Sequence, residues 1–147
     1  MVLVRVLQGL VSVAGRIALA AIFLMSTLGY KIPNFNSAAQ LMASKGIPAP
    51  RLMLVGAIVF LIVGSLSVIA GYKTRFGAAL ILVFLVLASY YFHNFWTLSD
   101  PKAQQEQMIH FMKNLSMMGA MLFIIANGPG AFSLDSRLAA RKLHERI

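Results

Sequence analysis

Hydrophobic residues occur along this chain in four long runs, with most of the charged residues between them. The runs extend from Val6 to Gly29, Leu52 to Tyr72, Phe76 to Trp96 and Met108 to Asn127. The last helix is expected to stop there, because Gly128, Pro129 and Gly130 follow. Each run is about the length that a helix needs to cross the hydrocarbon core of a bilayer, roughly 20 residues. None alternates apolar with polar residues as a strand of a membrane barrel would. The pattern therefore predicts an all-α integral membrane protein, a bundle of four transmembrane helices.

Composition agrees with this interpretation. Hydrophobic residues make up 59% of the 147 residues and charged residues only 12%, whereas soluble domains carry about 25% charged residues. At this length the whole chain, 1–147, is expected to form a single domain. The net charge is +9. Most of the basic residues that produce it lie beside membrane segments, so we expect contact with lipid and none with nucleic acid. The chain has no cysteine, which excludes disulfides and thiolate-bound metals.

The first run is expected to be a retained helix and not a cleaved signal peptide. Arg16 interrupts the apolar stretch that a signal peptide requires, and the sequence stays apolar beyond it to Leu28.

Basic residues predict the orientation in the membrane. Four lie in the first and third loops, and seven lie on the opposite side, in the N-terminus, the turn between the second and third runs, and the C-terminal tail. Because positive charge marks the cytoplasmic side, both termini are predicted to be cytoplasmic. The first loop also predicts a short outer helix over 37–45, and the basic tail, 131–147, is expected to be attracted to anionic lipid.

Polar side chains are rare inside the runs, and with this orientation most of them lie in the outer half of the membrane. His110, Lys113 and Asn114 share one helical face with Met117, because they are spaced i, i+3, i+4 and i+7. The other members of this set are Lys31, His93, Asn94 and Trp96. These residues, together with Arg16, are the candidate ligand-binding residues. We expect Lys113 to point into the bundle, where His93, Asn114 and Arg16 help to build one polar pocket open to the outer face.

Each candidate also has a purely structural interpretation. Lys31 lies at a helix exit, where reaching out to the headgroups is the favoured explanation, and Lys113 could do the same. Arg16 is harder to explain, because it is expected to lie about 15 Å into its helix and none of the four acids falls in an apolar run. Helix-end carbonyls, water or an anionic or carbonyl-bearing ligand must then satisfy Arg16.

No catalytic set emerges from the sequence. His93 and His110 have no nearby carboxylate to complete a metal site, so no metal is expected. There is no phosphate-binding loop and no HExxH motif.

Several stretches resemble the DoxX family of small four-helix membrane proteins, in particular its bacterial inner-membrane members. They include "GRIALAAIFLMSTLGYKIPNFN", "GYKTRFGAALILVFLVLASYYFHNFW" and "MKNLSMMGAMLFIIANGPGAFSLD". The resemblance covers Arg16 to Asp135 and implies a multi-pass protein of the bacterial inner membrane. The family pattern carries over to Arg16, Lys31, Thr74, Arg75, His93, Trp96, Lys113, Asn114 and residues 128–130.

The resemblance further implies an association with membrane redox complexes, since the family includes a small subunit of a thiosulfate:quinone oxidoreductase. Many relatives carry a glutamate in the second helix where Phe60 and Leu61 stand here, so a family Arg–Glu pair cannot be assumed. We therefore expect an accessory or ligand-binding subunit with a pocket for a quinone-like or anionic ligand, without catalytic activity by itself. The alternatives are a transport protein for a small anion or metabolite, or a structural membrane protein. A homo-oligomer is compatible with all three.

Overall fold

The computed structural model describes residues 2–145, and within this range every regular element is a helix. Four helices are long and apolar enough to cross a membrane. They are α1 (Val2–Ser26), which continues into the π-helical turn η1 (Thr27–Lys31), α3 (Pro50–Ala70), α4 (Thr74–Phe92) and α5 (Pro101–Asn127). The prediction of an all-α protein with four membrane-spanning helices is confirmed.

Three short helices complete the chain. They are α2 (Phe35–Ser44) in the first loop, the 3₁₀ segment η2 (Phe95–Thr97) in the third loop, and α6 (Leu134–His144) in the tail. The helix predicted over 37–45 in the first loop is therefore present, from Phe35 to Ser44; its place on the outer side stays a prediction. Arg146, the last base counted in the tail, lies outside the described residues.

The helix boundaries are set by local capping chemistry more than by the ends of the apolar runs. Asp100 accepts a hydrogen bond from Ala103 N at 2.8 Å and Pro101 opens the helix, so α5 begins seven residues before the predicted Met108. At its other end α5 stops at Asn127, as Gly128 and Pro129 predicted.

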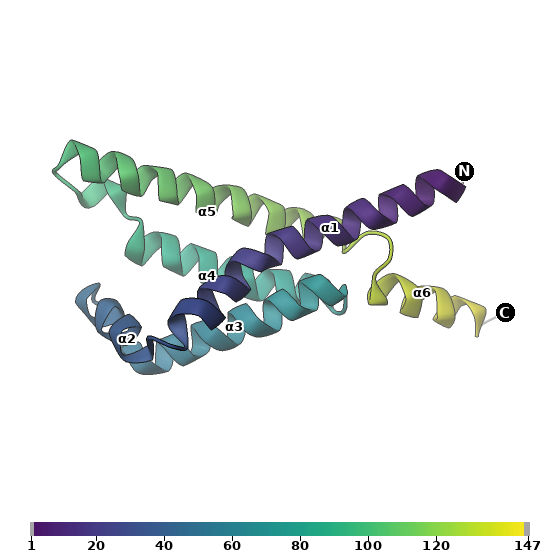
Figure 1. Cartoon of the computed structure of the whole chain (residues 1–147), viewed down its shortest axis with the longest axis horizontal. Coiled ribbons are helices and arrows are strands. Elements are labelled where there is room, and N and C mark those ends of the chain that lie inside the picture. Colours follow the sequence, from purple (N-terminus) through teal and green to yellow (C-terminus); the bar gives the residue numbers. More distant parts are fainter. Residues whose placement is uncertain (1, 146–147) are drawn as a thin grey trace.

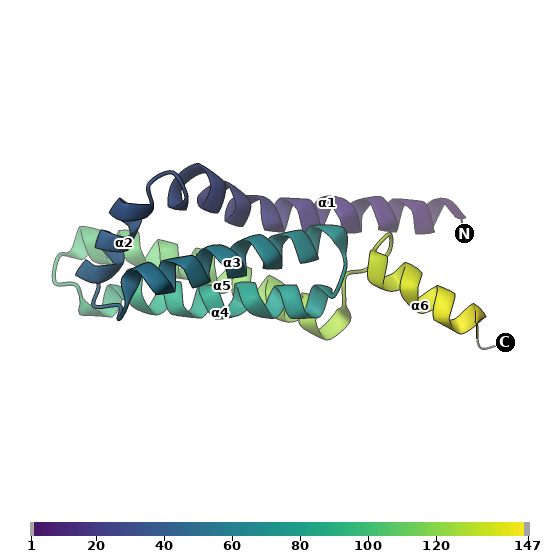
Figure 2. The same cartoon turned by 90° about the horizontal axis from the view of Figure 1, so that it is seen from below.

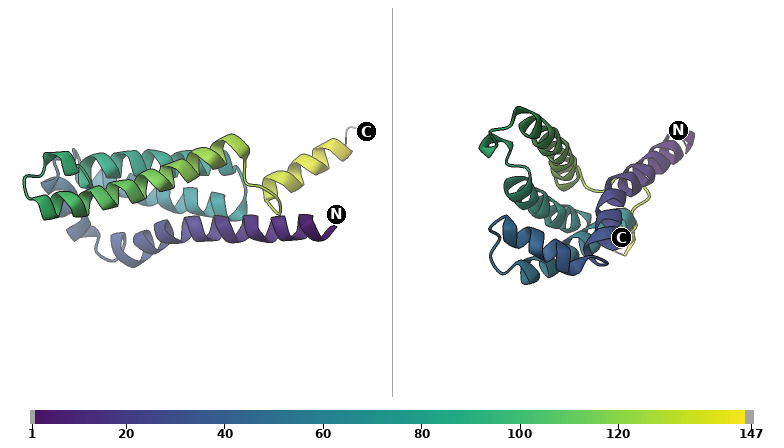
Figure 3. Two further views of the ribbon diagram at one scale, coloured as in Figure 1. Left: turned by 90° about the horizontal axis from the view of Figure 1, so that it is seen from above. Right: turned by 60° about the vertical axis from the view of Figure 1, so that its left-hand side comes forward.

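The four membrane helices are arranged in the order α1, α3, α4, α5, with α1 and α5 at the two edges (Figure 3). Along the chain, α3 packs on α4 and α4 on α5, while α1 packs on α3. Glycine permits a close contact between α3 and α4, because a Cβ on Gly64 of α3 would lie 2.9 Å from Gly77 O of α4. The core draws on all four helices, and its buried members are Phe23, Leu61, Val68, Ala78, Ile81, Leu85, Met121 and Ile124.

The two ends of the bundle differ. The loop end carries α2 and η2, whereas the other end carries the α3–α4 turn, both termini and the α5–α6 connector (residues 128–133), and is called here the connector end (Figure 1). The first half of α1 extends beyond α3 and α4 at the connector end, where α6 also projects (Figure 2). Both termini thus lie at the same end of the molecule.

Candidate functional site

The structure divides the predicted site residues between the two ends of the bundle. Arg16 lies at the connector end. The others lie in the half of the bundle next to the loop end, called here the loop half; they are Lys31, His93, Asn94, Trp96, His110, Lys113 and Asn114. The expectation that Arg16 belongs to the same pocket as the others is therefore wrong. The reason is that the first half of α1 extends beyond α3 and α4. Arg16, which lies 14 positions after the first residue of α1, is therefore only level with the end of α3.

Two histidines and a glutamine form the first polar group of the loop half. His93 ends α4, and its Nδ1 lies 2.8 Å from Gln107 Oε1 of α5. The His93 ring also stacks on the ring of His110, with centroids 5.2 Å apart. Gln107 was missed by the sequence interpretation because it precedes the fourth apolar run, yet it lies three residues before His110 on the same helix.

Asn114 provides a second polar contact between α4 and α5. Its Nδ2 donates to the hydroxyl of Ser89 at 3.0 Å, and Ser89 is buried. The amide thus joins two membrane helices, as polar side chains commonly do in lipid.

Lys31 does not extend toward the headgroups, contrary to the expectation from its position at a helix exit. It is half-buried, its Nζ donates to the hydroxyl of Ser26, and the ammonium lies 5.6 Å from the centre of the Phe84 ring on α4. The π-helical turn that carries Lys31 changes the direction of its side chain relative to a regular helix, and such turns occur frequently at functional sites.

Lys113 is exposed and has no hydrogen-bond partner among the described residues. It extends the stripe of α5 formed by Met117, Ala120 and Ile124, which pack on the core. Lys113 therefore lies on the same face of α5 as residues that pack on the core, but its own side chain, in the loop half, is exposed.

The aromatic residues after α4 cover the loop end. The Trp96 ring contacts Phe95 and Phe111 edge-on, with centroids 5.3 and 5.9 Å apart, and Trp96 is 51% exposed. Asn94 precedes this 3₁₀ turn and its carbonyl accepts from the Thr97 hydroxyl. In these contacts Asn94 acts through its backbone.

Arg16 is held by the α5–α6 connector. Its side chain is 4% exposed, and Nη2 donates to Phe132 O at 2.9 Å. Gly71, with φ at +66°, leaves the space for this guanidinium, since a Cβ there would collide with Nη1. Nε and Nη1 are buried and have no hydrogen-bond partner among residues 2–145.

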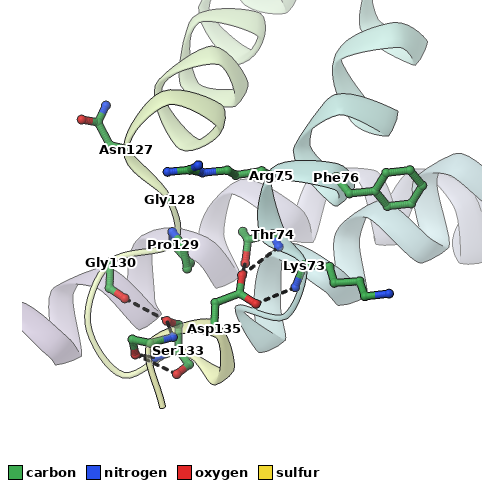
Figure 4. Close-up of a pocket in the computed structure, with 11 residues that line it drawn as sticks. Lys73, Thr74, Arg75, Phe76, Asn127, Gly128, Pro129, Gly130, Ser133 and Asp135 are labelled. Carbon is green, nitrogen blue, oxygen red and sulfur yellow. Dashed lines mark hydrogen bonds between the residues drawn. The ribbon is translucent and has the colours of Figure 1, made fainter. Parts of the chain in front are cut away.

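The acid that accompanies Arg16 comes from the tail. The Asp135 carboxylate attracts Arg16 through charge and accepts hydrogen bonds from Lys73 N, Thr74 N and the Thr74 hydroxyl at 2.9–3.0 Å (Figure 4). It therefore caps the first turn of α4, which has no cap of its own. The sequence interpretation assigned Asp135 to the loops and tail only; the "SLD" of the resemblance was the signal that could have found it.

The environment of Asp135 shifts its acidity. Burial alone would raise the pKa of this carboxyl, but the hydrogen bonds from Thr74 and Lys73 and the nearby Arg16 charge together hold the pKa below its ordinary value. The carboxylate is therefore ionised throughout the physiological range.

A cavity of about 840 Å³ opens beside this connection. It lies between the start of α4, the end of α5 and the start of α6 (Figure 4). Its lining residues are Lys73, Thr74, Arg75, Phe76, Asn127, Gly128, Pro129, Gly130, Ser133, Asp135 and Ser136. The sequence interpretation placed none of its candidate ligand-binding residues in this lining, although the family pattern covers Thr74, Arg75 and residues 128–130.

Comparisons with known proteins agree with the resemblance. The DoxX family model matches residues 11–94. The chain is 35% identical to "Inner membrane protein YphA" of Escherichia coli, over 83% of this chain and 86% of that protein. It is 32% identical to "Inner membrane protein YqjF" of the same organism, over 84% of this chain and 88% of that protein.

A more distant similarity reaches eukaryotes. "Surfeit locus protein 4 homolog" of Schizosaccharomyces pombe is 30% identical over 48% of this chain and 24% of that protein. No solved structure matches the chain. Together with the four membrane-spanning helices, the family match and the two Escherichia coli relatives confirm a multi-pass inner-membrane protein.

Proposed function

Since the chain belongs to the DoxX family of membrane proteins, we propose that it is a small ligand-binding subunit that serves a membrane redox complex. The ligand is a quinone-like molecule whose polar head lies in the loop half of the bundle. The observation that carries this proposal is the inward-turned ammonium of Lys31.

Lys31 is a cation held inside the membrane region without an acid. Among the described residues the only direct ion pair is Arg141–Glu145, far along the chain in α6. Within residues 2–145, the Lys31 ammonium makes one hydrogen bond, to the Ser26 hydroxyl, and lies over one aromatic ring, that of Phe84. A cation in this position is costly unless a ligand or water completes its hydrogen bonds, and a quinone carbonyl or a small anion has the chemistry to do so.

Further donors lie in the same half of the bundle, just after α4 and on α5. His93 and His110 present imidazoles, Asn114 presents an amide, and Lys113 a second ammonium. Donors on separate helices suit a head group with two carbonyl oxygens at opposite edges, as quinones have.

The arrangement of the helices favours entry from the lipid. α1 and α5 lie at the two edges of the bundle, and each packs mainly on one neighbouring membrane helix. Apolar residues dominate the faces between them, which suits the isoprenoid tail of a quinone. A purified protein alone would then bind the quinone, while electron transfer would need the redox complex.

Trp96 allows a direct test, because it is the only tryptophan of the chain and contacts Phe111, next to His110. The full-length protein in nanodiscs would be titrated with a short-tailed ubiquinone while tryptophan fluorescence is recorded. We expect saturable quenching in the natural protein. Replacing Lys31 by Met should weaken binding by about 1.5–3 kcal/mol, the contribution of a hydrogen bond to a charged group.

Lys45→Met is the matched control, since Lys45 is an exposed cation just after α2. It should bind as the natural protein does. Linear quenching that is equal in all three proteins would show that the quinone only collides with Trp96 from the lipid, and would contradict the proposal. If saturable binding is absent but a small anion shifts the fluorescence through Lys31, the transport alternative gains support instead.

A further inference from the structure

The cavity at the connector end is a second site, separate from the loop half. We propose that it binds the phosphate group of an anionic membrane lipid, with Arg75 as the anchoring residue. Four features of the structure lead to this assignment.

The first is an available cation. Arg75 lines the cavity, and its guanidinium makes one long hydrogen bond, from Nη2 to Ala126 O at 3.4 Å. In Figure 4 the side chain extends from α4 toward the end of α5, with Asn127 and Gly128 beside it. Arg75 is exposed, so most of its donors face the cavity opening or the solvent. A planar guanidinium in this state suits a phosphate, which accepts two parallel hydrogen bonds from it.

The second feature is the balance of charge. Among the described lining residues Asp135 is the one acid, and its oxygens already accept three hydrogen bonds from Lys73 and Thr74. Arg75 and Lys73 contribute two positive charges. The Lys73 ammonium lies at the edge of the cavity, 5.8 Å from the centre of the Tyr72 ring and directed away from Asp135 (Figure 4). The cavity therefore keeps an excess of positive charge after its internal contacts are satisfied.

The third feature is an apolar surface of α4 that adjoins the cavity. Phe76 lines the cavity and is 59% exposed. Val83 and Leu87 are also exposed and follow at spacings of seven and four, so all three lie on one face of α4. A molecule with a phosphate at Arg75 and an acyl chain along this face would match both parts of the surface.

The fourth feature is position. The cavity lies where α4 begins and α5 ends, at one end of two membrane-spanning helices. This is the level of the lipid headgroups, where basic pockets between helices bind phosphate-bearing lipids. A lipid is therefore a better fit than free phosphate.

The test compares lipids and variants in detergent. The full-length protein would be titrated with phosphatidylglycerol, phosphatidylcholine or inorganic phosphate, with bound lipid counted by native mass spectrometry and thermal stability measured in parallel. We expect one phosphatidylglycerol to bind tightly and to raise the melting temperature. Arg75→Gln should weaken this binding about tenfold, as expected for the loss of one charge-assisted contact.

Arg137→Gln is the matched control, because Arg137 is an exposed arginine of α6 at the same end and outside the cavity lining. It should bind phosphatidylglycerol as the natural protein does, and Arg75→Lys, which keeps the charge, should retain more binding than Arg75→Gln. Equal losses in Arg75→Gln and Arg137→Gln would reveal diffuse attraction and overturn the site. Equal binding of phosphatidylcholine, or equal protection by inorganic phosphate alone, would overturn the assignment to an anionic lipid.

Discussion

Arg16 illustrates how a single charged side chain is tolerated in an apolar helix. Its guanidinium is covered by the α5–α6 connector, bonded to Phe132 O, and attracted by Asp135. The same contacts require that Gly71 has no side chain. The charge is therefore part of the structural joint between α1, the α3–α4 turn and the tail.

Replacing Gly71 by Ala should destabilise this joint. The new Cβ would collide with Arg16 Nη1 and approach Ser133 closely, at a position whose φ of +66° favours glycine. Overpacking and backbone strain together should lower the free energy of unfolding by about 2–4 kcal/mol. Thermal unfolding in detergent would measure the effect. Gly119→Ala, where nothing lies within 4 Å of the added Cβ, should be neutral or slightly stabilising.

The Asp135 carboxyl should make the attachment of the tail sensitive to acid. Its pKa is lower in the folded protein than the ordinary value of about 3.9 in an unfolded chain. The stabilisation is therefore complete above about pH 4 and is lost as the pH falls through the folded pKa. Hydrogen exchange of the connector and α6, corrected for intrinsic rates, should accelerate in this acidic range. Asp135→Asn should exchange faster at neutral pH and show no such transition, whereas an unchanged transition would assign it to another group.

At the scale of single elements, caps define where the membrane helices begin and end. α5 starts at Pro101 because Asp100 accepts from Ala103 N, and α6 starts at Leu134 because Ser133 and Ser136 form reciprocal bonds. Helix α4 has no side-chain cap in its own sequence and receives one from Asp135, 61 residues after Thr74.

Removing the cap of α5 should loosen only its first turn. Asp100→Ala deletes the acceptor for Ala103 N, which typically costs about 1 kcal/mol. Faster hydrogen exchange is expected over the first turn of α5, with the segment near Met121 unchanged. Ser99→Ala changes the neighbouring position, which makes no side-chain cap, and should leave exchange as it was.

For the whole molecule, four crossings place both termini on the same side of the membrane. The excess of basic residues predicts that this side is the cytoplasm. A periplasmic activity reporter fused at residue 40 should then be active, and the same reporter fused after Ile147 should be inactive. The opposite pattern would place the connector end, with its lipid site, outside the cell.

The sequence by itself determined the class of the protein and most of its elements. Four apolar runs specify four membrane helices because the requirement for about 20 apolar residues is local. The stop at Gly128 and Pro129 was predicted for the same reason, since backbone chemistry acts on neighbouring residues. The start of α5 was missed because its first residues are polar and only their capping pattern marks them.

Tertiary structure alone decided which polar residues meet. Arg16 and Phe132 are 116 positions apart, and no periodicity relates them. The pairing depends on how far α1 extends past α3, which follows from packing. Lys31 turns inward because a π-helical turn ends α1, a backbone irregularity that the apolar pattern does not reveal. The chemistry of each side chain is known from the sequence, but contacts between distant segments set the depth and the direction of each group.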